Sequence, residues 1–195
     1  MKKQSARQLL LDATFEEVYT YGYAATSVDR ILKKASVPKG SMYHYFGSKK
    51  ALVLAMVEER LFPKMDEFFH FEKHKGCTVY ESFRNTFAAM SRNRPLIEHG
   101  CPLYRLMVEL SPVDKDFDKL LIEKYNQMHK GIAMLLKQGI DEKEFDESLD
   151  YLAFAAFMLS SVWGILSLSP SLSSPKVFIS QSRFLLDELN RYRIY

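Results

Sequence analysis

The fold is decided by residues 26–52, which read TSVDRILKKASVPKGSMYHYFGSKKAL. The first part of this stretch carries apolar residues at three- and four-residue spacing, namely Val28, Ile31, Leu32 and Ala35. This spacing predicts a short helix with one buried face. Thr26 and Asp29, three residues apart at the beginning of this helix, resemble a capping box.

A second helix is predicted directly after the first. Ser36-Val37 interrupts the apolar pattern, and Pro38 is suited to open a new helix because the first helical residue needs no amide donor. Ser48 then caps a third, longer helix that continues beyond Leu61. Two short helices joined by a tight turn within about twenty residues form a helix-turn-helix, whose second helix enters the major groove of DNA.

Residues 38–50 are rich in side chains that can bind phosphate. These are Lys39, Ser41, Tyr43, His44, Tyr45, Lys49 and Lys50. Gly40 costs a helix about 1 kcal/mol relative to alanine, but its missing side chain lets the helix lie close to a base or a sugar. The alternative is a solvated basic surface in which Tyr43 and Phe46 merely pack. Charge, donors, glycine and helix spacing coincide here, which favours contact with DNA.

The two lysines at 49 and 50 lie in the first turn of the third predicted helix. The helix dipole disfavours cations at this end. An anion near this turn would offset the effect, and a DNA phosphate is the natural candidate.

Composition describes an ordinary globular protein of 195 residues, with 47% hydrophobic and 26% charged residues and a net charge of +3. The charge is uneven. Residues 1–50 hold nine Lys/Arg against four Asp/Glu, and the remainder holds 18 against 20. A basic head on a slightly acidic body is expected when one end of a chain meets phosphates.

Helical patterns extend over the whole chain, which predicts an all-α fold. A first helix ends before Gly22, and Pro63 should bend or interrupt the helix that starts after Ser48. After a break at 74–78, five more helices are expected at 79–92, 102–110, 114–138, 146–168 and 175–190, with Gly139 as a stop and a loop at 169–174. The chain is therefore divided into a DNA-binding head at 1–50, joined by a long helix to a regulatory region at 51–195.

Residues 151–168 contain no charged residue. Eighteen uncharged positions are the lower limit for a membrane span, so a membrane-associated helical protein is one alternative. Three serines and the preceding acids argue against it. Ala156, Ser160 and Gly164 recur at steps of four, where another helix can approach closely. A buried helix at a subunit contact is favoured, and no membrane association is expected.

The residues quoted from 26–52, with Gly22-Tyr23 at the end of the first helix, resemble the DNA-binding head of the tetracycline-repressor (TetR-like) family of bacterial regulators. The likeness covers about residues 5–60. Ser36 departs from it, because the family has a glycine at this turn. The resemblance implies a homodimer, formed through the helices at 146–168 and 175–190, whose two heads bind a palindromic double-stranded operator. It also implies a small-molecule effector that releases a repressor from this operator.

The resemblance assigns roles in the head. Ser27 and Val28 start the supporting helix, Lys39, Gly40 and Ser41 face the bases, and Tyr43, His44 and Lys49 contact the DNA backbone. Tyr45 and His44 could exchange roles, since a small rotation of the helix separates base-facing from phosphate-facing positions.

The regulatory region is expected to hold an apolar or aromatic effector. The candidate pocket residues are Phe87, Met90, Leu103, Tyr104, Met107, Tyr125, Met128, Phe154, Phe157, Met158 and Trp163. An aromatic and methionine stripe is more often plain core, and the family likeness is what raises the pocket interpretation. Few ionisable residues interrupt these helices, and Glu109 and His129 are the exceptions of interest.

Other chemistry finds little support in the sequence. Glu67, His70, His74 and Cys77 have a spacing that could hold a transition metal, but no second ligand pair accompanies them, and no metal or cofactor is expected. Cys101 is interpreted as a small buried thiol. No nucleophile elbow or phosphate loop argues for an enzyme. Without a signal peptide or a disulfide framework, the cytoplasm is the expected location.

Overall fold

The computed structural model describes residues 4–69, 71–168 and 172–194. These residues are helical with no strand among them, which confirms the all-α prediction. One isolated antiparallel bridge joins Phe145 and Arg193. The described residues form two compact units.

The first unit contains residues 4–69 and Pro102–Leu121. Its helices are α1 (Ala6–Tyr21), α2 (Val28–Ala35), α3 (Lys39–Phe46), α4 (Lys49–Met56), α5 (Phe62–Phe68), α8 (Pro102–Leu110) and the beginning of α9 (Lys115–Asp141). A π-helical segment, Val57–Leu61, joins α4 to α5.

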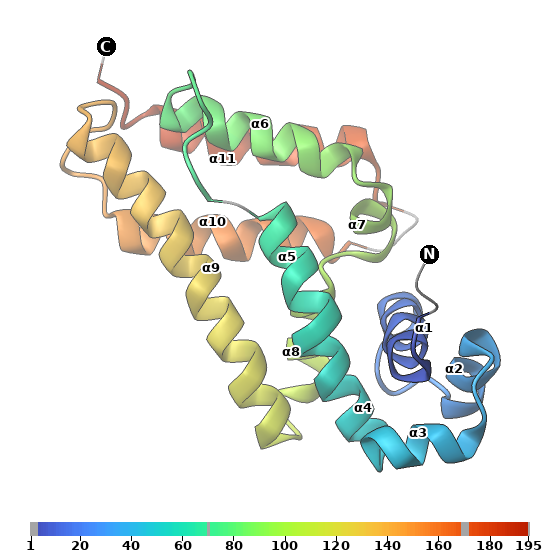
Figure 1. Ribbon diagram of the computed structural model, residues 1–195. Helices are drawn as coiled ribbons and strands as arrows, with labels where there is room; N and C mark the ends of the chain where they lie inside the picture. The colour runs from blue at the N-terminus through green and yellow to red at the C-terminus, as the bar shows by residue number, and fades with distance from the viewer. Residues whose placement is uncertain (1–3, 70, 169–171, 195) are drawn as a thin grey trace. The chain divides into compact units, whose positions relative to one another are not determined.

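Helix α1 is the centre of the first unit, because it contacts α2, α3, α4 and the π-helical segment (Figure 1). Fully buried apolar side chains from all four helices fill the space between them: Leu10, Leu11, Ile31, Met42, Leu52 and Val53. Burial of these side chains holds the short helices α2 and α3, which are too short to be stable in isolation. The resulting scaffold fixes the exposed face of α3.

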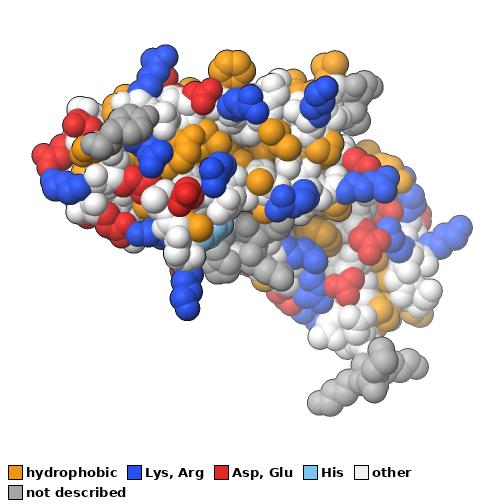
Figure 2. Space-filling view, turned by 90° about the horizontal axis from the view of Figure 1, so that it is seen from above, with side chains coloured by type: hydrophobic (Ala, Val, Ile, Leu, Met, Phe, Trp, Pro, Cys, Tyr) orange, Lys and Arg blue, Asp and Glu red, His pale blue; other side chains and the backbone are white. Residues whose placement is uncertain are grey.

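The second unit contains residues 71–101 and 122–194. Its helices are α6 (Val79–Arg92), α7 (Arg94–His99), the remainder of α9, α10 (Tyr151–Leu166) and α11 (Pro175–Asn190). Helices α6 and α11 run side by side (Figure 1), and α10 packs on α11 and on α7. Hydrophobic side chains remain visible as a band among lysines and arginines on the side that carries α6 and α11 (Figure 2).

The start of α2 differs from the sequence prediction. Ser27, not Thr26, precedes the helix, and no side chain caps it. Thr26 is buried, and its hydroxyl donates to the carbonyl of Gly22 at 2.6 Å. The predicted capping box is therefore wrong, because the Thr26 hydroxyl is used to close the turn that follows α1.

Pro63 interrupts its helix as predicted, and it does so through the π-helical segment before it. The amide of Phe62 donates to the carbonyl of Val57, five residues earlier. A proline removes one helical donor and clashes with the preceding turn. The wider π turn accommodates this without ending the helical path.

The predicted helices at 79–92, 102–110 and 175–190 are confirmed with the same bounds. No helix is expected between residues 92 and 102, yet α7 forms there. Proline is tolerated in the first turn of a helix, and the Asn93 side chain caps α7 by accepting from the amide of Leu96 at 3.0 Å.

Two helix ends around residues 139–150 were predicted incorrectly. Helix α9 passes through Gly139 and ends at Asp141. Gly139 is required for packing, since a Cβ atom there would collide with the Phe145 ring. Helix α10 starts at Tyr151 after the cap Asp150, whereas Asp146 instead accepts from the amide of Ser148 in a turn. The predicted loop at 169–174 lies partly outside the described residues.

Candidate nucleic-acid interface

Helix α3 presents most of its side chains to solvent. Met42 is its single fully buried residue and anchors it to the core of the first unit. Lys39, Gly40, Tyr43, His44 and Tyr45 are exposed, and Ser41 is half-buried. The residues with predicted base and backbone contacts therefore lie on the open surface of this helix.

The donor side chains of α3 make few contacts with the described residues. Among the residues that the structure describes, no hydrogen bond or ion pair engages the side chains of Lys39, Ser41, Tyr43 or His44. The contact between the His44 and Tyr45 rings, 5.2 Å between centroids, involves π-faces and leaves their polar atoms available. Exposed donors of this kind can bind a ligand without first breaking a bond within the protein.

The turn between α2 and α3 is built around Ser36, which has a φ of 53°. This left-handed conformation favours glycine, which explains why the family has glycine here. The turn closes through two bonds to α2, from the amide of Ser36 to Lys33 and from the amide of Val37 to Leu32. Ser27 and Val28, predicted to touch DNA from α2, are both half-buried at the first turn of that helix.

Lys49, the first residue of α4, is engaged with Tyr23. Its Nζ donates to the Tyr23 carbonyl at 2.7 Å and lies 4.5 Å from the centroid of the Tyr23 ring. Partial burial lowers the pKa of Lys49 from its ordinary value, and the Arg30 charge adds to this effect while the Glu109 charge opposes it. The predicted phosphate contact of Lys49 thus starts from an existing intramolecular bond.

Lys50 is held by two carboxylates. Its Nζ lies 2.8 Å from Asp114 and 2.7 Å from Asp116, both in the segment that leads from α8 into α9. These hydrogen bonds raise the pKa of Lys50 and lower the pKa of Asp114. Asp114 and Asp116 therefore supply, from within the chain, the negative charge that the helix dipole favours at the first turn of α4.

A clasp formed by two α8 side chains, Arg105 and Glu109, holds the turn after α1, and no local sequence pattern indicates it. Glu109 accepts from the amides of Tyr23 and Ala24 at 2.9 and 2.6 Å. Arg105, one helical turn earlier, donates to the carbonyls of Tyr19 and Thr20 at 3.2 Å. Arg105 thereby satisfies carbonyls that the end of α1 leaves without an intrahelical donor. Glu109 is thus a structural residue of the first unit.

Tyr23 joins these contacts. Its amide is bonded to Glu109, its carbonyl to Lys49, and its ring meets the Phe117 ring edge-on at 5.5 Å. Burial raises the pKa of the Tyr23 hydroxyl, and the nearby Asp114 charge adds to the rise. The turn at Gly22–Ala24 is consequently fixed from α4, α8 and α9.

The predicted pocket residues are distributed over both units. Leu103, Tyr104 and Met107 belong to α8 in the first unit, and the other eight lie in the second unit. Tyr125 is at the centre of an aromatic cluster in the second unit, with Trp163 at 5.6 Å and the His129 ring stacked at 6.2 Å. Phe157 is 49% exposed on α10.

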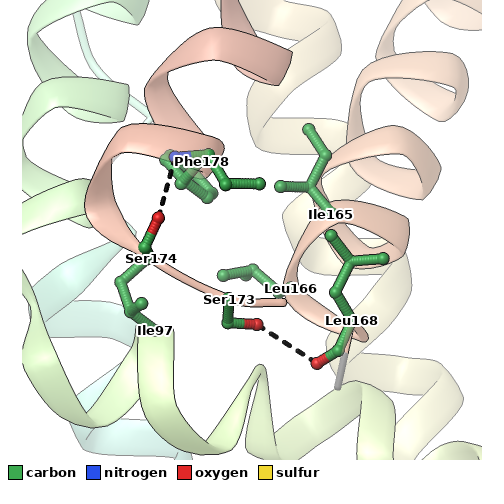
Figure 3. Close-up of a pocket in the computed structure, with 8 residues that line it drawn as sticks. Ile97, Ile165, Leu166, Leu168, Ser173, Ser174 and Phe178 are labelled. Atoms are coloured by element: carbon green, nitrogen blue, oxygen red, sulfur yellow. Dashed lines mark hydrogen bonds between the residues drawn. The ribbon is translucent and has the colours of Figure 1, made fainter. Parts of the chain in front are cut away.

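Cavities lie among the described residues of the second unit. One, of about 10 Å³, lies between α7, α10 and α11 and is lined by Ile97, Ile165 and Phe178 among others (Figure 3). Its volume matches a single water molecule. Another, of about 530 Å³, opens between Phe71–Lys73 and α9. None of the eleven candidate residues lines either cavity, so the effector pocket stays a prediction.

The metal hypothesis gains no support from the described residues, which contain no group of three potential ligands. His70 lies outside the described residues, and His74 uses its backbone amide to donate to the Ser82 hydroxyl. Cys101 is buried, as predicted. No helix within the described ranges has the length and apolar character of a membrane span.

Helix α3, the second helix of the helix-turn-helix, is exposed and rich in donors, and it is held by the buried faces of α1, α2 and α4. This arrangement defines a DNA-binding helix-turn-helix regulator. Two family models match: that of the tetR family of bacterial regulatory proteins over residues 10–56, and that of the tetracyclin repressor-like C-terminal domain over residues 80–180. The chain belongs to the tetR family of transcriptional regulators.

Relatives and structures agree with this assignment. The chain is 30% identical to the transcriptional regulator AcuR of Cereibacter sphaeroides, over 77% of this chain and 70% of that protein. It is 25% identical to the transcriptional repressor DhaR of Mycobacterium sp., over 84% and 82%. A TetR regulator from Chloroflexus aurantiacus has the same fold, with a TM-score of 0.85, 20% identity and 97% of both chains covered.

Proposed function

We propose that the chain is a homodimeric repressor that binds a palindromic operator through α3 and leaves it when a small apolar or aromatic effector binds. In the proposed complex α3 lies in the major groove, with Lys39, Gly40 and Ser41 at the bases and Tyr43 and His44 at the phosphates. The carrying observation is that the polar side chains of α3 are exposed and have no partner in the described part of the chain.

Gly40 supports this orientation. It is exposed, and a Cβ atom built on it meets no atom within 4 Å. Packing within the described part of the chain therefore does not require a glycine at this position in the first turn of α3, although glycine lowers helix stability. A DNA surface that approaches α3 closely at residue 40 would explain why this residue is a glycine.

Lys49 can join the DNA contact without leaving Tyr23. An ammonium group has three N–H donors, and the Tyr23 carbonyl occupies one of them. We assign Lys49 a phosphate contact that adds to, and does not replace, its intramolecular bond.

The proposed dimer forms through α10 and α11. Large apolar side chains on these helices remain in contact with solvent in the single chain: Leu152, Phe157, Ile179 and Phe184, the last 74% exposed. On α10 the small residues Ser160 and Gly164 are also exposed, and a Cβ at Gly164 would meet nothing within 4 Å. A second copy of the chain can pack closely against such a face, and its two heads then meet two half-sites.

The effector acts on the spacing of the two heads. It would bind best to the spacing that mismatches the operator, and it can shift the equilibrium only by its difference in affinity between the two spacings. The aromatic cluster around Tyr125 and Trp163 in the second unit favours an apolar or aromatic effector. The bacterial cytoplasm is the compartment in which such a regulator meets its operator.

Selection of bound duplexes from a random DNA pool tests this function. The purified full-length chain should enrich a palindrome whose half-sites are about one helical turn or more apart. Phe184→Asp provides the matched test of the dimer, because a charge on this exposed side chain should give monomers that no longer enrich both half-sites. Failure of the unsubstituted chain to enrich any sequence would contradict the proposal.

A further inference from the structure

We propose that Asp114 and Asp116 compete with a DNA phosphate for the ammonium group of Lys50, and so limit what this lysine adds to DNA affinity. The inference rests on the proposed DNA contact of the helix-turn-helix. It adds that Asp114 and Asp116 regulate how Lys50 takes part in this contact. Lys50 lies one position after Lys49, in the first turn of α4.

The geometry fixes Lys50 in the free protein. Its ammonium bridges the two carboxylates at 2.8 and 2.7 Å. Asp114 is itself held, because its Oδ1 accepts from the amides of Asp116 and Phe117 at the start of α9. The start of α9 thus fixes the position of the Asp114 carboxylate. The long, flexible side chain of Lys50 adjusts its conformation to reach this carboxylate.

This arrangement is poorly explained as a device for stability alone. Ion pairs between exposed side chains add little to folding, and the side chains of Lys50, Asp116 and Asp114 are 38%, 71% and 23% exposed. Two carboxylates around one ammonium also leave a net negative charge beside the first turn of α4, which contains Lys49. A phosphate that approaches this turn is repelled unless Lys50 turns from the carboxylates to the phosphate.

Asp114 lies between α8 and α9, and Asp116 lies in the first turn of α9, so neither carboxylate belongs to the helix-turn-helix. A displacement of residues 114–116 changes how firmly Lys50 is held. With the carboxylates in place, Lys50 contributes little to DNA binding; with them withdrawn, it adds one phosphate contact. The pair Asp114 and Asp116 thereby sets the charge available at the start of α4.

A double-mutant cycle on the full-length chain tests the competition. Asp114→Asn combined with Asp116→Asn removes both charges, while asparagine keeps a carbonyl oxygen for the cap of α9. The dissociation constant for the duplex enriched in the selection, and for a random-sequence duplex of equal length, is measured from 50 to 200 mM salt. The same pair of substitutions is then repeated in a Lys50→Gln chain.

The expected result is a gain in affinity of about five- to tenfold near 0.1 M salt, the contribution of one further released counterion, with a salt slope steeper by about 0.9. In the Lys50→Gln chain the gain should fall below twofold. Asp116→Asn alone, which leaves the cap of α9 untouched, should give a smaller gain of the same sign.

The control removes two carboxylates elsewhere in the first unit. Glu58→Gln with Asp118→Asn changes the net charge equally, and neither side chain has a hydrogen bond or ion pair to the described residues; it should leave the salt slope unchanged. Equal gains with and without Lys50, or no gain at all, would overturn the competition while the DNA-binding function stands. Absence of DNA binding by the unsubstituted chain would instead overturn the proposed function, and this inference with it.

Discussion

Helix α3 and the first turn of α4 carry similar donors but differ in what these donors touch. On α3 the side chains of Lys39, Tyr43 and His44 are exposed and have no polar partner among the described residues. At the start of α4, Lys49 is bonded to Tyr23 and Lys50 to two aspartates. DNA contacts by α3 break no intramolecular bond, whereas contacts by α4 add to or exchange existing ones. We therefore expect α3 to supply affinity and base preference, and α4 to adjust them.

The largest effect is expected for Lys39→Ala. Loss of a base contact costs about 1–3 kcal/mol, so operator affinity should fall by about 5- to 150-fold. Lys49→Ala should cost less affinity, because Lys49 already shares its donors with Tyr23. Both are measured by fluorescence anisotropy with a labelled operator duplex. Lys130→Ala, which changes an exposed lysine of α9 far along the helix from residues 114–116, is the matched control. A greater loss for Lys49→Ala than for Lys39→Ala would reverse the comparison.

Glu109→Ala should loosen the turn that holds Lys49. It removes two hydrogen bonds from a carboxylate to the amides of Tyr23 and Ala24, and hydrogen bonds to charged groups contribute about 1.5–3 kcal/mol. Because water can reach the amide of Ala24, we expect the free energy of unfolding in urea to fall by about 1–2 kcal/mol. Glu58→Ala, which loses no such bond, should leave stability unchanged. An unaltered unfolding midpoint for Glu109→Ala would show that the clasp is not needed.

Gly40→Ala should move stability and DNA binding in opposite directions. A Cβ at residue 40 meets no atom of the chain, and replacing a helical glycine by alanine stabilises by about 0.5–1 kcal/mol. The same methyl group should obstruct the close approach of α3 to DNA and lower operator affinity several-fold. Urea unfolding and operator titration on the same preparation measure both. Higher stability with unchanged affinity would place residue 40 away from the DNA.

The smallest effect is expected for Lys50→Gln on folding. Its ion pair with Asp116 is exposed to solvent and its ion pair with Asp114 is partly exposed, and exposed pairs add little to stability. The thermal unfolding midpoint should therefore match that of the unsubstituted chain within error. A clear drop in this midpoint would mean that Asp114 and Asp116 hold Lys50 for the sake of the fold, and would weaken the competition with phosphate.

Local signals in the sequence were sufficient for most helices. The bounds of α6 and α11 follow from their caps Thr78 and Ser174 and from Pro175, because caps and prolines act over a few residues. Where a residue had two possible roles, the prediction went wrong: Pro95 opens α7, and Gly139 makes room for Phe145.

Contacts between distant parts of the sequence could not be predicted. Glu109 meets Tyr23 across 86 positions and Lys50 meets Asp116 across 66. A glutamate or aspartate on a helix surface has the same local pattern whether it faces water or a backbone amide. The residues predicted to contact DNA lie on α2, α3 and α4 or directly before α2, but the partners of Lys49 and Lys50 required the three-dimensional packing.

The most direct test of the account compares base preferences selected by two proteins. The unsubstituted chain and Lys39→Ala are each used to select duplexes from the same random pool, and the base frequencies are determined at every position. We predict a palindrome for the unsubstituted chain, and for Lys39→Ala the same palindrome with one position in each half-site losing its preference. Identical preferences for both proteins, or no enrichment by the unsubstituted chain, would contradict the claim that the open face of α3 reads DNA.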